Sequence, residues 1–345
     1  MSIFSQLPPS TSDICSDHDF LLGENMKKMI VTAICGILAY SPIHAADQSW
    51  REFVSDVRQE ALSEGIEPRL FDSAFRDIRP NRRVKSYARS QPEHRLTFSK
   101  YRRTRASKYR IALGKKHFNR NENLLNEVGH NFGVDPCFVV SIWGMETSYG
   151  NFMGKFPVIR SLATLAYDSK RKNFFRKELI LALHIVNEGH VSLYDYKGEW
   201  AGASGQPQFL PSSFSRYAVD YNRDGRKDIW KTKADVFASI ANYLKQKGWK
   251  RGEPWAFEVK LPRGFDMTQE GKKIRKPVSE WSRQGVMMPN GAELPNQDLE
   301  ASIIKPYGGP AFLAFNNFRV IMRYNNSTYY AGSIGYMADK ICKRR

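Results

Sequence analysis

The chain has 345 residues, enough for two or three compact units, and 41% of them are hydrophobic and 13% aromatic. This composition is that of a folded protein and excludes a disordered chain. The chain carries 53 Lys and Arg against 35 Asp and Glu, a formal net charge of +18, which suggests an acidic polymer or surface as partner. A basic face without a specific ligand is also compatible with this charge.

The N-terminal segment has the pattern of an export signal. Two lysines at 27–28 precede an apolar run over residues 29–40, and the small residues Ala45 and Ala46 follow it. This order is typical of a secretory signal peptide, and the run is too short to cross a membrane. We therefore expect export to the periplasm, with the mature chain beginning near Ala46 and an upstream start codon accounting for residues 1–25. A lipid anchor is disfavoured because an isoleucine, not a small residue, precedes the cysteine of this run.

Export changes how the charge and the cysteines are interpreted. Removal of the expected signal takes away two of the 53 basic and four of the 35 acidic residues, which raises the net charge to about +20. For an exported chain, cell-wall glycan with peptide carboxylates, or a membrane surface, fits this charge better than nucleic acid does. Cys137 and Cys342 remain, and they could pair in an oxidising compartment, although simple packing of Cys137 is the favoured interpretation.

The first part of the expected mature chain is polar and helical in pattern, over residues 50–129. A first helix is predicted over 50–64, with Gly65 as its stop. Two strongly basic stretches follow, at 76–89 and 100–116.

The residue pattern along the chain then changes twice. Residues 130–250 contain amphipathic helices over 173–188 and 234–247. Prolines, glycines and short alternating runs become frequent from 252 to 315, which predicts a small β-rich insertion. Residues 316–341 return to a helix-compatible pattern that could pack on the middle region. The expected units are an upstream segment with the signal at 1–45, a helical domain at 46–130, a core at 131–250, the insertion at 251–315 and a returning segment at 316–345.

One helix in the core has both ends marked, between Val134 and Gly150. Asp135 is a suitable N-cap, Pro136 fits the first helical position, and Gly150 can close the C-terminal end.

The face of this helix carries a glutamate among apolar residues. Val139, Ile142, Trp143 and Glu146 are spaced i, i+3, i+4 and i+7, so they share one face. A carboxyl on that face is partly desolvated, which raises its pKa and keeps a proton available near neutral pH. Glu146 is therefore a candidate general acid, and a buried glutamate satisfied by a core hydrogen bond is the alternative.

A loop rich in Gly and Ala follows downstream, over residues 198–214. It leaves backbone open to close approach by a ligand, and its glutamines and aromatic residues suit the hydroxyls and C–H faces of a sugar. An ordinary loop that enters a helix capped by Ser212 or Ser213 is the alternative.

Several motifs in the same order resemble the lytic murein transglycosylase B family, from about residue 50 to 341. They are residues 146–150, 153–155, 162–165, 205–213 and 323–330. The resemblance implies a mainly α fold: a lysozyme-like α+β core, a helical N-terminal domain and a small β-rich insertion.

The resemblance also implies cleavage of the β-1,4 bond between N-acetylmuramic acid and N-acetylglucosamine without water. Glu146 matches the family's single catalytic carboxylate, which would protonate the glycosidic oxygen and then deprotonate the C6 hydroxyl that attacks C1. A 1,6-anhydro end results. An internal nucleophile and assistance from the substrate N-acetyl group make the usual second carboxylate unnecessary.

The same matching places further residues near the substrate. Gln208 and Phe209 are expected to line the glycan cleft, and Tyr324, Asn325 and Tyr330 to approach the acid from the C-terminal segment. The implied partner is peptidoglycan, bound by a monomer without nucleic acid or an organic cofactor.

The sequence departs from the family pattern at two positions. Many relatives have serine where Glu199 stands and methionine where Ser204 stands. Glu199 could be a second carboxylate near substrate, could meet the amine of a stem peptide, or could be surface charge, which we favour. A lysozyme-type hydrolase and a non-catalytic peptidoglycan-binding protein therefore remain as alternatives.

A second motif resembles the first half of an EF-hand calcium loop, with its D-x-N-x-D-G pattern beginning at Asp220. The usual glutamate at position 12 is replaced by Lys231, and Asp235 matches the family's replacement ligand in a longer loop. We expect a structural calcium ion, and a metal-free Asx turn is the alternative. The expected ligands are Asp220, Asn222, Asp224, the carbonyl of Arg226, Asp228 and Asp235.

Overall fold

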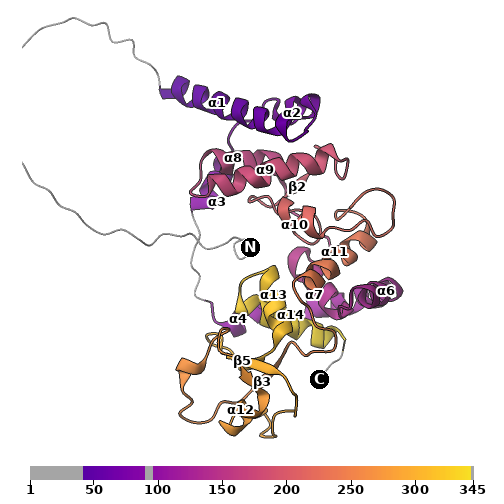
Figure 1. Ribbon diagram of the computed structural model, residues 1–345, viewed down its shortest axis with the longest axis vertical. Helices are drawn as coiled ribbons and strands as arrows, with labels where there is room; N and C mark the ends of the chain where they lie inside the picture. Colours follow the sequence, from indigo (N-terminus) through magenta and orange to yellow (C-terminus); the bar gives the residue numbers. More distant parts are fainter. Residues whose placement is uncertain (1–41, 90–95, 343–345) are drawn as a thin grey trace, which may run out of the picture.

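The computed structural model describes residues 42–89 and 96–342, so the expected export signal lies outside the described residues apart from its cleavage region. Figure 1 shows a mostly helical molecule with the first two helices at one end and a small sheet at the other. Within the described ranges, no helix combines the length and apolar character needed to cross a membrane.

The N-terminal part is helical, as predicted. The first helix ends at Ser63 and Gly65 follows it with φ +85°, a conformation that suits glycine. The two basic stretches are largely helical, except that residues 76–81 lie between two helices. The helices are α1 (Pro42–Ser63), α2 (Pro68–Phe75), α3 (Arg82–Arg89), α4 (Phe98–Arg105), α5 (Lys108–Arg120) and α6 (Glu122–Phe132).

The middle of the molecule is built around α7 (Pro136–Thr147), which α5, α6, α11 and α14 contact. Because helices surround it, α7 is buried on nearly every side and not on one face alone. The two amphipathic helices predicted from periodicity are confirmed to within one residue, as α9 and α11. The other elements of this region are β1 (Phe156–Pro157), α8 (Val158–Tyr167), α9 (Lys172–Asn187), β2 (Lys197–Gly198), α10 (Pro211–Tyr217), α11 (Lys233–Gln246), α13 (Asn316–Tyr324) and α14 (Thr328–Ile341).

The start of α7 follows the sequence signals, but its end does not. The Asp135 side chain accepts a hydrogen bond from the backbone N–H of Cys137, and Pro136 is the first helical residue. The helix stops at Thr147, and Ser148 and Tyr149 already adopt left-handed φ angles of 49° and 63°. The prediction that Gly150 closes the helix is therefore wrong by two residues.

The predicted β-rich region forms an antiparallel sheet in the order β3-β6-β5-β4. Figure 1 shows this sheet at the lower end of the molecule. Leu313 of the central strand pairs with Phe257 on one side and Ile303 on the other. Trp281 is fully buried in a separate small core beneath the sheet. The elements are β3 (Ala256–Val259), the 3-10 turn η2 (Met267–Gln269), β4 (Lys276–Pro277), α12 (Val278–Arg283), β5 (Glu300–Ile304) and β6 (Ala311–Ala314).

A disulfide joins Cys137 to Cys342, with the two Cα atoms 6.2 Å apart. It ties the first turn of α7 to the residue that caps the end of α14. The interpretation of Cys137 as simple packing is therefore wrong. It failed because the pairing depends on how two helices far apart in sequence lie against each other.

Candidate active site

Glu146 lies in the last turn of α7, where the N-terminal turn of α14 meets it. The Tyr330 hydroxyl donates a hydrogen bond to Oε1 of Glu146 over 2.6 Å. Tyr330 is fully buried, while Glu146 keeps part of its surface exposed. Tyr330 thus holds the carboxyl from α14, while the Glu146 residue as a whole is only half-buried.

Burial raises the pKa of Glu146 from its ordinary value of 4.5 to about 7. The hydrogen bond from Tyr330 and the positive charge of Arg105 oppose this rise, because both favour the carboxylate. The result is a carboxyl that can hold a proton at neutral pH and also lose it. Such a group can serve first as an acid and then as a base.

An aromatic wall stands behind the acid. The rings of Tyr324 and Tyr330 lie nearly parallel with centroids 6.5 Å apart, and the Tyr324 hydroxyl donates to the carbonyl of Pro207 over 2.5 Å. Phe209 packs against Tyr324 and Tyr243. Phe209, Tyr324 and Tyr330 are all fully buried, so the expectation that Phe209 lines a cleft is wrong for this conformation.

Gln208 and Asn325 are also brought close to this wall, and both are largely buried. Gln208 has a left-handed φ of 54°, and its amide nitrogen donates to the carbonyls of Gly205 and Met153. A non-glycine residue in this conformation is held there by its surroundings. Asn325 caps the end of α13, and its carbonyl accepts from the backbone N–H of Ser327. Contact of either side chain with sugar stays a prediction.

Gln206 is one of the two loop glutamines that the sequence suggested for sugar hydroxyls, but its amide bonds to protein groups. Its Oε1 accepts from the Trp143 indole over 2.7 Å, and its Nε2 donates to the Trp230 carbonyl over 2.8 Å. Its backbone carbonyl accepts from the Thr147 hydroxyl. Gln206 therefore fixes the loop after β2 to the last turn of α7. No sequence signal pointed to Trp143 and Trp230 as its partners.

The turn after α7 is held from a different helix. Arg110 of α5 donates from its guanidinium to the Ser148 hydroxyl over 3.0 Å, and its carbonyl accepts from the Tyr149 hydroxyl over 2.7 Å. These bonds stabilise the two consecutive left-handed residues that follow Thr147, the last residue of α7. The acid thus lies in the last turn of α7, directly before a turn that α5 holds in place.

A family model described as the transglycosylase SLT domain matches residues 49–339. The chain belongs to this family. Its relative "Membrane-bound lytic murein transglycosylase B" of Escherichia coli K12 is 32% identical over 259 residues, covering 71% of this chain and 68% of that protein. The resemblance seen in the motifs is confirmed, and the chain is a lytic transglycosylase.

Solved structures agree with this assignment. SltB3 of Pseudomonas aeruginosa, in complex with NAG-anhNAM-pentapeptide, is 43% identical with a TM-score of 0.83, covering 86% of this chain and 80% of that one. The same protein has also been solved with NAG-NAM-pentapeptide. An Escherichia coli lytic transglycosylase in complex with calcium is 26% identical with a TM-score of 0.73, covering 90% of this chain and 96% of that one. The expected lysozyme-like α+β fold is thereby confirmed.

The loop that carries Glu199 in this transglycosylase is packed tightly against the segment after α7. A Cβ on Gly154 would lie 2.1 Å from the Gly198 carbonyl carbon, so only glycine fits at that contact. Glu199 is partly exposed, its backbone N–H donates to the Ala203 carbonyl, and Ser204 is buried. The place of Glu199 in the reaction stays a prediction.

The helix that ends this loop is capped differently from what the sequence suggested. Leu210 is the N-cap of α10, and Pro211 is the first helical residue. The buried carboxylate of Glu178 on α9 accepts from the backbone N–H of Ser212 over 2.9 Å. Capping by Ser212 or Ser213 is therefore wrong, because a carboxylate from another helix satisfies the exposed backbone donor.

The backbone of the calcium-type loop adopts the conformation that the EF-hand-like motif predicts. Gly225 adopts φ +86°, and the Asp220 carboxylate accepts from the backbone N–H groups of Asp224 and Gly225. Asp235 is fully buried, and its two oxygens accept from the N–H groups of Tyr221 and Asp228. Asp220, Asn222, Asp224 and Asp235 therefore supply hard oxygen donors around one turn.

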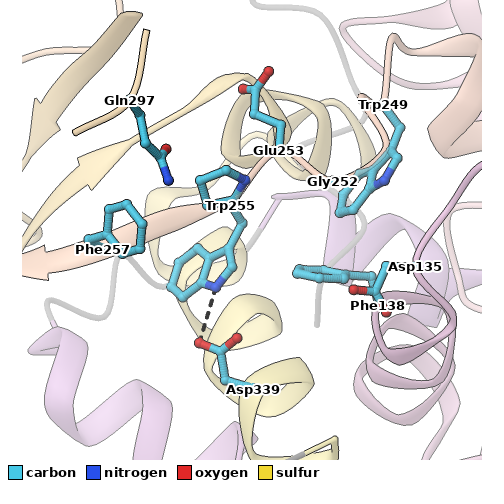
Figure 2. A pocket seen from close by; sticks show the side chains of 10 residues that line it. Asp135, Phe138, Trp249, Gly252, Glu253, Trp255, Phe257, Gln297 and Asp339 are labelled. Carbon is cyan, nitrogen blue, oxygen red and sulfur yellow. Dashed lines mark hydrogen bonds between the residues drawn. The ribbon is translucent and has the colours of Figure 1, made fainter. Parts of the chain in front are cut away.

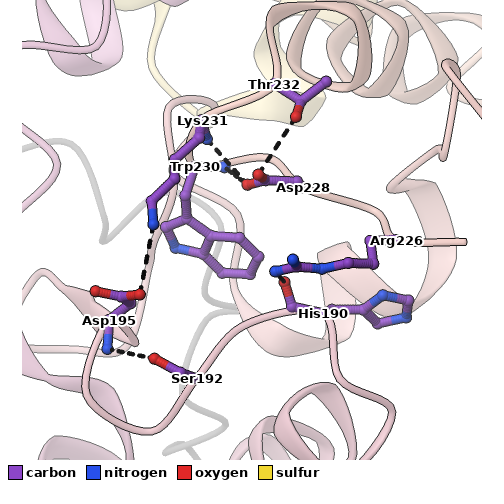
Figure 3. Close-up of polar contacts among 8 residues, drawn as sticks. All are labelled: His190, Ser192, Asp195, Arg226, Asp228, Trp230, Lys231 and Thr232. Atoms are coloured by element: carbon purple, nitrogen blue, oxygen red, sulfur yellow. Dashed lines mark hydrogen bonds and ion pairs between the residues drawn. The ribbon is translucent and has the colours of Figure 1, made fainter. Parts of the chain in front are cut away.

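The carboxylate of Asp228 closes the end of this loop through hydrogen bonds (Figure 3). One of its oxygens accepts from the N–H groups of Trp230 and Lys231, and the other accepts from the Thr232 hydroxyl. These bonds close the turn ahead of α11, and the calcium-ligand role expected for Asp228 stays a prediction. Nearby, the Arg226 guanidinium donates to the His190 carbonyl over 3.3 Å. The described residues contain no group of three or more His, Cys, Asp or Glu that could hold a metal, so any site here depends on Asn222 and backbone carbonyls as well.

Proposed function

We propose that Glu146 is the single catalytic carboxylate of this lytic transglycosylase and that its substrate is the MurNAc–GlcNAc bond of peptidoglycan. The observation that carries the proposal is the hydrogen bond from Tyr330 to the buried Glu146 carboxyl, whose burial raises its pKa to about 7. The fragments bound to SltB3 support the substrate class.

The reaction balances with one carboxyl. Glu146 donates its proton to the glycosidic oxygen as the bond from that oxygen to C1 of the muramic acid breaks. The C6 hydroxyl of the same sugar then attacks C1, and the Glu146 carboxylate takes its proton. The product is a 1,6-anhydro end, and Glu146 is again protonated for the next cycle.

Tyr330 has a distinct part in this scheme. Its hydroxyl orients one carboxylate oxygen and stabilises the charged form that exists between the two proton transfers. The other carboxyl oxygen of Glu146 is proposed to face the substrate. Gln208 and Asn325 are proposed to contact the sugar near this position, and the buried rings of Tyr324 and Phe209 to support them from behind.

Product analysis tests the proposal. The mature protein and its Glu146→Gln variant digest purified peptidoglycan, and mass spectrometry identifies the new ends. We expect anhydromuropeptides from the wild type and at least a 100-fold loss in the variant, because general acid catalysis contributes about 10²–10⁴. Glutamine keeps the size of the side chain and can still accept from Tyr330.

Glu199→Gln is the matched control. Retained anhydro products in this variant would support the single-carboxylate mechanism. Reducing ends from the wild type that vanish with Glu199→Gln would instead favour a lysozyme-type hydrolase. Binding of peptidoglycan without any product from folded protein would favour the non-catalytic alternative.

We also propose that the loop from Asp220 to Asp235 holds a structural calcium ion. The ligands would be Asp220, Asn222, Asp224, Asp235 and the Arg226 carbonyl, and the ion would fix the loop between α10 and α11. The relative solved with calcium and the oxygen-rich turn support this assignment. No step of the reaction depends on the ion.

The cellular setting and the division of the chain are proposals of the same kind. The signal-like segment over 29–40 supports export to the periplasm, where peptidoglycan is accessible. The four units from residue 46 onward, drawn at 130, 250 and 315, are consistent with the run of helices, core, sheet and closing helices. Limited proteolysis of the mature protein would test these boundaries.

A further inference from the structure

One buried carboxyl of the core has no part in the reaction scheme, although it lies beside the loop over residues 198–214. Glu178 is on α9, and only 2% of its surface is exposed. Burying a carboxyl is costly unless hydrogen bonds compensate for the lost water. A glutamate in this place therefore has a task that an apolar residue could not perform.

The Glu178 carboxyl caps α10 from outside that helix. Its Oε2 accepts from the backbone N–H of Ser212 over 2.9 Å. Pro211, the first helical residue, has no N–H, so Ser212 carries the first backbone donor of α10. Burial raises the pKa of Glu178, while the contact with Ser212 and the charges of Arg216 and Arg171 lower it. The bond thus joins α9 to the point where the loop enters α10.

The segment directly before α10 is buried and leaves little room to absorb a shift of this helix. Leu210 is 3% exposed and packs against Phe174 of α9. Phe209 and Ser204 exchange two backbone hydrogen bonds, of 3.0 and 2.9 Å. A displacement at the beginning of α10 would therefore be passed on to Gln208, two residues before Leu210.

Gln208 is the strained residue of this loop. Its φ of 54° is left-handed, a conformation that persists in a non-glycine residue only where the surroundings hold it. Its side-chain nitrogen donates to the carbonyls of Gly205 over 2.9 Å and Met153 over 3.2 Å. Because these bonds fix the amide nitrogen, they also fix the direction of the amide oxygen. A change in the backbone of Gln208 would redirect that oxygen.

Other elements anchor the first half of the loop. The Thr147 hydroxyl of α7 donates to the Gln206 carbonyl over 3.0 Å, and the Tyr324 hydroxyl of α13 donates to the Pro207 carbonyl over 2.5 Å. Glu178 supplies the corresponding polar anchor at the other end of the loop, from α9. Gln208 lies between these two sets of anchors.

A cavity of about 270 Å³ at the beginning of α7 is not part of this arrangement (Figure 2). Asp135 lines it and precedes Glu146 by eleven positions, which corresponds to roughly 16 Å along a helix. The described residues that line it include Trp249 and Trp255 but none of residues 204–212. The loop, and not this cavity, is the part of the core that connects Glu178 to the acid.

We propose that Glu178 is a positioning residue for the lytic reaction: its bond to Ser212 holds the beginning of α10 so that Gln208 is presented to the glycan. Because Gln208 contacts the sugar only under the proposed function, this role of Glu178 rests on that function. Glu178 acts from α9 and not at the reacting atoms.

Three substitutions separate the hydrogen bond from the charge. Glu178→Gln keeps an acceptor at the same reach without the charge, and Glu178→Asp keeps the charge on a side chain that is one methylene shorter. Glu178→Leu removes both. We expect Glu178→Gln to keep KM within about twofold of wild type, and the other two to raise it about tenfold, the scale of a lost hydrogen bond.

Kinetics on soluble, uncrosslinked peptidoglycan strands distinguish positioning from stability. An enzyme that is merely destabilised has fewer folded molecules, so its apparent kcat falls while KM stays the same. A displaced Gln208 raises KM instead, while kcat stays within about threefold and the alkaline limb of the pH profile, which reports Glu146, does not move. Glu122→Ala removes an exposed acid in the first turn of α6 and should match wild type in both constants.

The readout does not depend on the chemistry at Glu146. The rate counts every cleaved bond, whichever ends form, so reducing ends would contradict the proposed reaction and leave this comparison intact. The Kd of GlcNAc-MurNAc-pentapeptide should rank the variants in the same order, even for a protein that does not cleave.

A double-mutant cycle tests whether Glu178 acts through Gln208. Gln208→Ala alone should raise KM, and Glu178→Leu in that background should raise it by less than about a further twofold, because the two residues act as one unit. If Glu178→Leu does not fold, Glu178→Asp takes its place in the cycle. The proposal fails if Glu178→Gln and Glu178→Asp have equal KM values, if Gln208→Ala leaves KM unchanged, or if the two effects multiply.

Discussion

Tyr330 donates its hydroxyl proton to the carboxylate of Glu146 across 2.6 Å, and the two residues come from helices that meet only in the folded chain. The bond lowers the pKa of Glu146, while burial raises it more strongly. The balance between these two effects places the acid near neutral pH. The active site is thus set by a contact between α7 and α14 and not by α7 alone.

Tyr330→Phe should shift the pH profile of the reaction. The first step needs protonated Glu146, so wild-type activity should fall as the pH rises through about 7. Removing the hydroxyl takes away a bond to the carboxylate, so the pKa of Glu146 rises and the alkaline limb moves to higher pH. We expect the maximal rate to fall about tenfold as well, because a charge-assisted bond that orients the base is lost.

Tyr329→Phe is the control for that change. Tyr329 is the preceding residue of the same helix turn, and its hydroxyl donates to the Tyr307 carbonyl instead. Its pH profile should match wild type. Rates of anhydromuropeptide release between pH 5 and 9 would decide, and an unmoved alkaline limb in Tyr330→Phe would contradict the assignment.

Glu146→Gln should make folding stability less dependent on pH. The folded chain keeps the Glu146 proton up to about pH 7, whereas an unfolded glutamate releases it near 4.5. The folded state therefore binds more protons in that window, and wild-type stability falls as the pH rises through it. The variant lacks this loss and should gain on the order of 2–3 kcal/mol relative to wild type between pH 4 and 8.

Urea unfolding of both proteins at pH 4, 6 and 8 measures this difference. Parallel stability curves would mean that the Glu146 carboxyl is not desolvated in the folded protein. The comparison is between two proteins that differ at one position, so other titrating groups cancel.

The parts of the fold that the sequence predicted are those that local rules decide. The amphipathic periodicity of α9 and α11, and the Asp135 cap with Pro136, depend only on residues within a few turns. The same periodicity singled out Glu146 as a carboxyl on an apolar face. Its partner Tyr330 followed from family resemblance, since no local pattern joins residues 184 positions apart.

The miss at Phe209 has the opposite character. Phe209 sits in a motif expected to touch sugar, yet packing against Tyr243 and Tyr324 buries it, and these contacts are tertiary. Asp228 fits a calcium pattern by spacing, and its carboxylate also accepts from three donors two to four residues along the chain. Those contacts are local, so tertiary packing does not decide between the two roles of Asp228.

Gln206→Leu should destabilise the protein strongly, although leucine and glutamine are similar in size. The change leaves the Trp143 indole N–H and the Trp230 carbonyl buried without this partner. Unpaired buried groups cost about 1–3 kcal/mol each, so a loss of about 2–4 kcal/mol is expected. The exposed Gln246→Leu at the end of α11 should change stability by less than about 0.5 kcal/mol. Chemical denaturation of wild type and the two variants measures the difference. Equal denaturation midpoints would contradict the conclusion that Gln206 stabilises the fold through these two bonds.

Calcium should raise the unfolding free energy if the loop binds it. At a free concentration 100 times Kd the gain is about 2.7 kcal/mol, and a chelator should reverse it. Asp224→Asn should weaken the effect by removing one charged ligand, whereas Asp195→Asn, an acid outside the ligand set, should not. Thermal melts with Ca²⁺, Mg²⁺ and chelator would measure this, and identical melting temperatures in all three would favour a metal-free turn.

The disulfide between Cys137 and Cys342 should stabilise the fold without taking part in the reaction. It closes a sequence separation of 205 residues, so removing it enlarges the unfolded ensemble considerably. Replacing both cysteines with alanine should cost about 2–5 kcal/mol of unfolding free energy. The bond fastens α7 and α14 at the end away from Glu146 and Tyr330, so the folded variant should keep its pH optimum.

Urea unfolding with and without a reductant provides the measurement: reductant should destabilise wild type to the level of the double alanine variant and leave that variant unchanged. A wild type that reductant does not affect would mean that the two cysteines are not joined in the mature protein.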